Sequence, residues 1–242
     1  MPSKSIDALA RQAQSILGIE LAEAQLAQFE QLTDLLLDWN ARMNLTGITE
    51  PAEIALKHYL DSLTVLNVLP KARRGRLLDV GTGAGFPGLP LAIARPWLRV
   101  TLLDATAKKL RFVEAAGRAL GLDNIRIAHA RAEDAGRDDA HRGTYDFVTA
   151  RAVSRMPALM ECTLPLTKRG GMVIAMKGAA THAEVRSANK AIATLGGELA
   201  DIHEVRLPGL EKPRFLALVR KVGKTPRRYP RQAGSPSRDP IL

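Results

Sequence analysis

Residues 77–88 read LLDVGTGAGFPG, an apolar run that ends in a series of closely spaced glycines. The apolar run has the length of a buried strand, and Pro87 suits the first turn of a helix, where a missing N–H loses no hydrogen bond. Glycine accepts positive φ angles and lets the backbone approach a ligand closely. The segment therefore predicts a strand, a ligand-binding loop and a helix, in that order.

The chain around this loop alternates between strand-like and helix-like segments. Amphipathic stretches such as 107–120 and 182–195 separate most of the short apolar runs, which is typical of a parallel sheet covered by helices on both faces. The last two runs are separated by Pro208 and Gly209 and predict an antiparallel hairpin. The apolar runs are Leu77–Val80, Val100–Leu103, Ile125–Ala128, Phe147–Ala150, Met172–Met176, Leu199–Leu207 and Arg214–Val219.

Segments of different character flank this alternating core. Residues 1–70 contain two helical patterns, Leu21 to Met43 and Ile54 to Leu66, with apolar residues at steps of three and four. Residues 222–242 are rich in Pro, Arg and Lys, contain little apolar surface to bury and are expected to be disordered in the free protein. The expected organisation is a helical extension over 1–70, a core over 71–221 and a basic tail over 222–242.

Three ligands compete for the glycine loop, and its spacing and neighbouring residues help to separate them. A nucleoside triphosphate site would need Lys-Ser or Lys-Thr after the glycines, and neither follows. The dinucleotide pattern G-x-G-x-x-G occurs from Gly83, but counted from the first glycine, Gly81, it fails at Phe86. Asp79 would repel a pyrophosphate and attract the cationic amino group of methionine. S-adenosylmethionine is therefore favoured, while a dinucleotide and a ligand-free turn remain alternatives.

Two later acidic residues follow strand-like runs at the positions that a nucleoside ligand needs. Asp104 ends the second run, roughly twenty residues after the first glycine, where a carboxylate can bind both ribose hydroxyls. Ala132 and Glu133 follow the third run, and we expect their backbone and the carboxylate to bind the adenine edge. Phe86 is expected to pack on the ligand.

Basic residues near strand ends are candidates for substrate contacts. Arg151 follows the fourth run directly, which places it at the carboxyl edge of the sheet, where ligands bind in open α/β folds. It can hold the methionine carboxylate, contact a base or touch a phosphate. Lys177, after the fifth run, is a weaker candidate for an RNA phosphate. Arg227, Arg228 and Arg231 surround Tyr229 in the tail, a combination that suits a segment that binds a nucleic-acid strand and orders on binding.

Composition restricts the partner and the compartment. The chain has 35 Lys+Arg against 25 Asp+Glu, and the net charge of +10 favours a polyanionic partner such as nucleic acid or an anionic membrane. The single cysteine, Cys162, excludes an internal disulfide, which fits a reducing cytosol. Apolar stretches of signal-peptide or membrane-spanning length are absent from the sequence. We expect a cytoplasmic protein with no membrane association.

The motifs together resemble the ribosomal small-subunit methyltransferase G family, which is also called glucose-inhibited division protein B. The segments that carry the resemblance are LLDVGTGAGFPGLPLAIARP, VTLLDATAKKLRFVE, ARAED and DFVTARAV. WNARMNLTGI and KHYLDSL resemble the amino-terminal region of the family, and KTPRRYPRQAGSP resembles its basic ending. The resemblance therefore covers nearly the whole chain.

The resemblance implies a class I S-adenosylmethionine-dependent methyltransferase fold, which is α/β and Rossmann-like. It implies a mostly parallel sheet, a C-terminal antiparallel hairpin and an N-terminal helical extension. The implied reaction moves a methyl group from S-adenosylmethionine to N7 of a guanine in 16S ribosomal RNA. The substrate would be the small subunit or its assembly intermediate, and a monomer without a metal is expected. The family's cofactor positions correspond to Gly81, Phe86, Ala132, Glu133 and Arg151.

The chemistry of N7 methylation agrees with the residues. Guanine N7 has an exposed lone pair and no proton, so its methylation needs positioning but no general base. Methylation of pyrimidine carbon 5 needs a thiolate, and Cys162 stands in the apolar segment MPALMECTLPL. His58 lies within a helical pattern and is interpreted as a packing residue. We therefore expect no catalytic side chain. An NAD(P)-dependent oxidoreductase and a non-catalytic RNA-binding module remain the alternatives.

Overall fold

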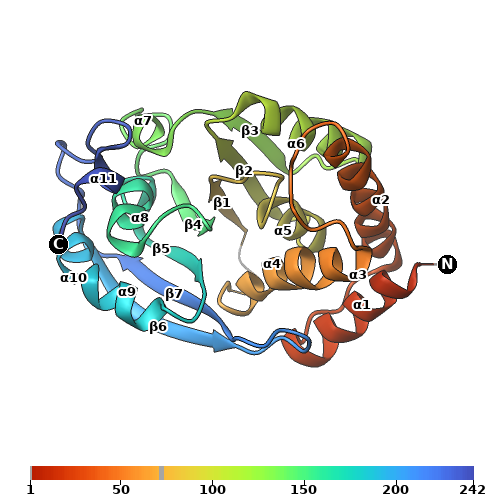
Figure 1. The fold of residues 1–242 in the computed structure, drawn as a ribbon. Coiled ribbons are helices and arrows are strands. Elements are labelled where there is room, and N and C mark those ends of the chain that lie inside the picture. Colours follow the sequence, from red (N-terminus) through yellow and green to blue (C-terminus); the bar gives the residue numbers. More distant parts are fainter. Residues whose placement is uncertain (1, 71–73) are drawn as a thin grey trace.

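The computed structural model describes residues 2–70 and 74–242, and its centre is a twisted seven-stranded sheet (Figure 1). The strand order is β3-β2-β1-β4-β5-β7-β6, in which β1 to β5 are parallel and β7 runs antiparallel to both of its neighbours. The strands are β1 (Gly75–Val80), β2 (Leu98–Asp104), β3 (Ile125–His129), β4 (Tyr145–Arg151), β5 (Thr167–Lys177), β6 (Gly197–Val205) and β7 (Arg214–Lys221). The parallel sheet with a terminal hairpin is confirmed.

Helices cover the two faces of the sheet, and the sheet separates two hydrophobic clusters. Successive residues of a strand point to opposite faces, and Leu77 and Leu78 of β1 are accordingly both fully buried but belong to different clusters. The first face carries α1 (Lys4–Leu17), α2 (Glu23–Asn40), α5 (Gly88–Ala94) and α6 (Ala107–Ala119). The second carries α7 (Ala132–Ala135), α8 (Met156–Thr163), α9 (Thr181–Ser187) and α10 (Asn189–Thr194). Within the described ranges, each helix is too short or too polar to cross a membrane.

The helical pattern at 54–66 forms one continuous segment of changing helical type. It comprises α3 (Pro51–Ile54), the π-helical stretch η1 (Ala55–Leu60), α4 (Asp61–Leu63) and the 3-10 turn η2 (Thr64–Asn67). π-Helical turns are rare and frequently mark functional sites. The segment shares the first cluster with α5, so the extension and the sheet have a common core. The expected boundary after residue 70 adjoins residues 71–73, which lie outside the described part of the chain.

The tail differs from the expectation of disorder, because the structure folds it against the second face. It forms α11 (Ser235–Arg238), which lies beside α8 in Figure 1. The tail offers few apolar side chains, but its backbone carbonyls and charges have partners in the rest of the protein. Arg142 donates hydrogen bonds to the carbonyls of Thr225 and Tyr229, and Arg231 pairs with the fully buried Glu161. Polar contacts, more than hydrophobic burial, therefore hold the tail against the second face.

Candidate active site

The glycine loop connects β1 to α5 at the carboxyl edge of the sheet. Gly81, Gly83 and Gly85 have φ angles of 67°, 59° and 88°. L-residues with a side chain rarely adopt such angles, so the loop needs glycine there. The Thr82 amide donates to the Leu103 carbonyl at 3.0 Å, which joins the loop to β2. The backbone thus takes the close turn that the sequence predicts.

Asp79, near the end of β1, is fully buried and tied to both ends of the loop. Its Oδ2 accepts hydrogen bonds from the Thr82 hydroxyl at 2.6 Å and the Gly88 amide at 2.9 Å. Its Oδ1 has no partner among the described residues. Burial raises the pKa of Asp79 to about 6, against the lowering effect of these hydrogen bonds. The carboxylate is therefore charged at neutral pH and has one acceptor atom free for a cation.

Asp104 ends β2 and is bonded directly to the glycine loop. Its Oδ2 accepts a hydrogen bond from the Gly83 amide at 2.9 Å, and its Oδ1 accepts one from the Thr106 amide at 2.7 Å. An ionised carboxylate has about four lone-pair sites, so both oxygens can still accept bonds from ribose hydroxyls. The structure therefore brings together the first two elements of the predicted cofactor site.

Ala132 and Glu133 begin α7 beside the end of β2. The Ala130 amide donates to the Asp104 carbonyl at 3.2 Å, which holds this turn next to the predicted ribose position. The Glu133 side chain is buried, and its Oε1 accepts a hydrogen bond from the Gly234 amide at 2.8 Å. The carboxylate expected at the adenine edge thus already binds the tail. Glu133 Oε2 and the backbone of this turn are left to meet an adenine.

Phe86 and Arg151, two further predicted residues, meet around His58. The rings of Phe86 and His58 stack with centroids 4.5 Å apart, and the Arg151 guanidinium carbon lies 5.6 Å from the Phe86 centroid. Arg151 donates from Nη1 to Asp61 Oδ2 and to the Lys57 carbonyl, both at 3.0 Å. Its Nη2 lies 3.2 Å from His58 Nδ1. The π-helical stretch therefore supplies partners that fix Arg151 in place.

His58 is neutral in this setting. Burial and, to a smaller extent, the Arg151 charge lower its pKa to about 4. Nδ1 therefore accepts a hydrogen bond from Arg151, and Nε2 carries the proton that it shares with the Thr46 hydroxyl at 2.9 Å. The sequence predicts that His58 is a packing residue, and the structure shows that it packs against Phe86 of the candidate site. Asp61 was not singled out, although an acid on an apolar helix face was a usable signal.

A hollow of about 410 Å³ opens beside Arg151, at the ends of β4 and β5. Asp61 Oδ1 lies 3.2 Å from Arg214 Nε, so this carboxylate holds two arginines at the hollow. Met176 and Phe215 contribute apolar wall. The lining combines cations, a carboxylate and apolar surface, which suits a nucleobase. Arg214 is another residue that sequence reasoning missed, because its role depends on β7 returning beside β5.

The predicted RNA contacts are not gathered around this hollow. Lys177 lines it, but its ammonium donates to the Ser154 carbonyl at 2.6 Å and pairs with Glu184 at 2.7 Å, so its charge is already compensated. Arg227 and Arg228 are exposed on the part of the tail that Arg142 holds just before β4. They therefore lie near the amino-terminal edge of the sheet, away from the glycine loop.

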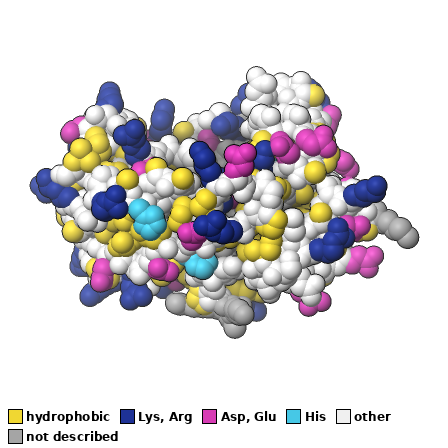
Figure 2. Space-filling view, turned by 60° about the horizontal axis from the view of Figure 1, so that its bottom comes forward, with side chains coloured by type: hydrophobic (Ala, Val, Ile, Leu, Met, Phe, Trp, Pro, Cys, Tyr) yellow, Lys and Arg dark blue, Asp and Glu magenta, His cyan; other side chains and the backbone are white. Residues whose placement is uncertain are grey.

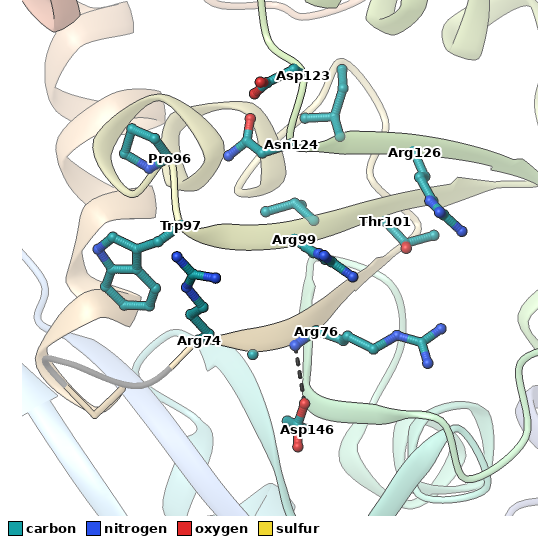
Figure 3. A pocket seen from close by; sticks show the side chains of 13 residues that line it. Arg74, Arg76, Pro96, Trp97, Arg99, Thr101, Asp123, Asn124, Arg126 and Asp146 are labelled. Carbon is teal, nitrogen blue, oxygen red and sulfur yellow. Dashed lines mark hydrogen bonds between the residues drawn. The ribbon is translucent and has the colours of Figure 1, made fainter.

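A wider hollow of about 940 Å³ lies at that amino-terminal edge (Figure 3). We call it the arginine groove, after the exposed side chains of Arg74, Arg76, Arg99 and Arg126 that line it. The last three extend toward the same side of the sheet in Figure 3. On the face shown in Figure 2, basic side chains are instead spread among acidic and apolar ones. Asp123 and Asp146 also line the groove, so its four arginines leave a net positive charge.

Solved structures with this fold are methyltransferases. A 16S rRNA (adenine(1408)-N(1))-methyltransferase from Catenulisporales acidiphilia, solved with its cosubstrate SAM, matches with a TM-score of 0.51 at 20% identity, over 64% of this chain and 88% of that one. TrmN from Thermus thermophilus matches with a TM-score of 0.51 at 24% identity, over 66% of this chain and 49% of that one. The strand order and these likenesses thus define the fold of class I S-adenosylmethionine-dependent methyltransferases.

The chain belongs to the rRNA small subunit methyltransferase G family, whose model matches residues 25–211. The ribosomal RNA small subunit methyltransferase G of Desulforamulus reducens is 46% identical over 231 residues, 96% of each chain. The protein of that name from Bacillus subtilis is 45% identical over 224 residues, 93% of this chain and 94% of the relative. Family membership confirms the resemblance, identifies S-adenosylmethionine as the cofactor and excludes the oxidoreductase alternative.

Proposed function

We propose that this protein transfers the methyl group of S-adenosylmethionine to N7 of a guanine in 16S ribosomal RNA. The names of the relatives support a ribosomal RNA substrate. The resemblance to the family suggests the guanine and its N7 atom. The observation that carries the proposal is the glycine loop between two buried carboxylates, one of which has a free oxygen. The site of action would be the cytoplasm, and the acting species a monomer.

The residues present fit the cofactor, which supplies an electrophilic methyl group on a sulfonium. Asp79 Oδ1 is the buried acceptor that a cationic amino group would satisfy. Gly81 lets the backbone approach the ligand, and Asp104 would accept bonds from the ribose hydroxyls. The backbone of Ala132 and Glu133 would meet the adenine edge. Arg151 lines the adjacent hollow and lies over the ring of Phe86, which follows the glycine loop.

We place the target guanine in the 410 Å³ hollow. Arg151 uses three N–H groups on Asp61, Lys57 and His58, and a guanidinium has five, so further donors remain for O6 or a phosphate. A contact with O6 leaves the N7 lone pair free for in-line attack. The walls from Met176 and Phe215 would exclude water from the base. Orientation is therefore the contribution of these residues.

The protonation states agree with a reaction that needs no proton acceptor. His58 has a pKa of about 4, and both of its ring nitrogens have hydrogen-bond partners, so it is poorly suited to act as a base. Burial raises the pKa of the Cys162 thiol far above neutrality, which argues against a thiolate nucleophile. Both observations favour nitrogen N7 over carbon 5 of a pyrimidine.

The basic surfaces support an extended RNA substrate. The arginine groove and the tail residues Arg227 and Arg228 lie at the sheet edge opposite the glycine loop. RNA that reaches both edges must be larger than a short strand, as a small subunit or its assembly intermediate is. Lys177 is the weakest of the proposed contacts, because Glu184 already pairs with it.

The test is methyl transfer to RNA in a purified system. The protein is incubated with isotopically labelled S-adenosylmethionine and either naked 16S RNA or small subunits that lack the modification. Mass spectrometry of nuclease fragments should locate one 7-methylguanine, and Asp79→Asn should slow its formation at low cofactor concentration. RNA that is bound but remains unmethylated would favour the non-catalytic RNA-binding module.

A further inference from the structure

A buried carboxylate on α8 is satisfied by the tail. Glu161 is fully buried, and the Arg231 amide donates to its Oε1 at 2.7 Å. The Arg231 side chain donates from Nε to Oε1 at 3.0 Å and from Nη2 to Oε2 at 2.8 Å. Removing one partner of such a buried pair leaves an uncompensated charge, which is strongly unfavourable. Arg231 is therefore held firmly at α8.

The same stretch of tail also holds α7. Gly234, three residues after Arg231, donates its amide to Glu133 Oε1 at 2.8 Å. Gly234 has a φ of 82°, so a residue with a side chain would be strained there. Arg137 donates from Nε to the Pro230 carbonyl at 2.9 Å. A Cβ on Gly136 would lie 2.8 Å from Pro230 Cγ, so tail and α7 are in close contact.

The turn that begins α7 depends on such outside support. α7 has four residues, and a helix that short is not stable by its own hydrogen bonds. Its buried Ala135 belongs to the second cluster, and its Glu133 carboxylate is held by Gly234. The position of the Ala132–Glu133 backbone is therefore set partly from the tail side.

We propose that Arg231 and Gly234 are positioning residues for cofactor binding, acting through Glu133 on the turn that meets the adenine. The inference rests on the proposed cofactor contacts of Ala132 and Glu133. Arg231 locks the tail to Glu161, and the locked tail presents the Gly234 amide to Glu133. The tail thus sets the affinity for S-adenosylmethionine from more than ninety residues along the chain. Linkage makes the effect reciprocal, so the bound cofactor also stabilises the tail.

The experiment compares the full-length protein with Arg231→Met and the double variant Glu161→Gln/Arg231→Met. The double variant removes both charges, so it avoids the unpaired buried carboxylate if the single variant fails to fold. Arg238→Met is the matched control, because Arg238 is exposed on α11 of the same tail. Calorimetry gives the Kd of S-adenosylhomocysteine, and methyl transfer gives kcat and the KM values. Hydrogen exchange of the 231–239 amides is measured with and without S-adenosylhomocysteine.

The expected result is a roughly 5- to 30-fold increase in Kd and in the KM for S-adenosylmethionine in both Arg231 variants. The kcat at saturating cofactor and the KM for RNA should stay unchanged, and Arg238→Met should match the wild type. S-Adenosylhomocysteine should slow exchange in the wild-type tail. The proposal would be wrong if the Arg231 variants lost thermal stability but kept the wild-type Kd, and if S-adenosylhomocysteine did not change exchange in the tail. The tail would then have a structural role only. A wild type that binds no S-adenosylhomocysteine would instead overturn the proposed cofactor site.

Discussion

The rings of His58 and Phe86 stack with only 9° between their planes. This contact joins the π-helical stretch of the amino-terminal extension to the glycine loop. The extension therefore forms part of the site, because it supplies His58 and Asp61 to hold Arg151. Disturbing it should affect both stability and substrate binding.

Replacement of His58 by Asn should make stability less sensitive to acid. The folded-state pKa of about 4 lies below the ordinary value of 6.5, so the unfolded chain takes up a proton first as the pH falls. Stability from this group is complete above pH 6.5 and is lost as the pH falls toward 4. The slope is at most about 1.4 kcal/mol per pH unit. Urea unfolding of both proteins across this range measures it, and parallel pH curves would contradict the prediction.

Asp79→Asn should weaken cofactor binding while retaining the shape of the side chain. Loss of a buried charge opposite the cationic amino group is expected to cost about 2 kcal/mol, or roughly 30-fold in the Kd of S-adenosylhomocysteine. The wild-type affinity should fall as the pH drops through about 6, where Asp79 becomes protonated, and the variant should lack this dependence. Calorimetry provides the measurement. Asp123→Asn, an exposed acid of the arginine groove, is the control and should bind normally.

Neutralising the arginine groove should reduce the salt dependence of RNA binding. Each arginine that contacts a phosphate contributes about 0.7 to the slope of log K against log salt on single strands. Replacement of Arg76, Arg99 and Arg126 by Gln should therefore lower the magnitude of this slope by up to about 2. Filter binding of 16S RNA over a series of salt concentrations reports it. Arg118→Gln, whose charge is paired with Glu114 on α6, serves as the control. Identical slopes would mean that the groove does not contact RNA.

Gly88→Ala should destabilise the fold at the base of the glycine loop. A Cβ there would lie 2.0 Å from Leu102 Cδ2 and 2.9 Å from Asp79 Oδ2, so the side chains of Leu102 and Asp79 must shift. Overpacking of this kind costs about 1–3 kcal/mol. A Cβ on Gly47 has no atom within 4 Å, so Gly47→Ala should be nearly neutral. The urea midpoints of both variants test this, and a neutral Gly88→Ala would show that the loop tolerates bulk.

Cys162 should be unreactive and dispensable for catalysis. Burial raises the pKa of its thiol, which leaves almost no thiolate at neutral pH. A thiol reagent should therefore react with the native protein only at the rate of unfolding, and quickly in urea. Cys162→Ala should retain the kcat of the wild type. Loss of methyl transfer in a folded Cys162→Ala protein would reopen a nucleophilic mechanism.

Local patterns were sufficient for the strands and for most of the cofactor loop. The apolar runs predict which residues are buried, and the glycines of the loop predict positive φ angles that other residues avoid. Asp104 was also predictable, because the carboxyl ends of adjacent parallel strands lie side by side. The helical pattern at 182–195 is an exception, since it divides into α9 and α10 at Ala188.

Local sequence patterns did not predict which partner each charged side chain has in the fold. Glu133 is predicted to bind the adenine, and only the structure shows that its Oε1 also accepts a hydrogen bond from Gly234. The tail is predicted to be disordered, but its Arg231 pairs with the buried Glu161. Lys177 is predicted to contact a phosphate, but the packing of α9 beside β5 pairs its ammonium with Glu184.

The sequence by itself therefore determined the α/β alternation, the methyl-donor loop and the family, because periodicity and glycine geometry are local properties. Tertiary structure alone decided that Asp61 holds Arg151 and that the tail supports α7. Such pairs form only when distant segments meet, and a buried charge is stable only beside the partner that the fold provides.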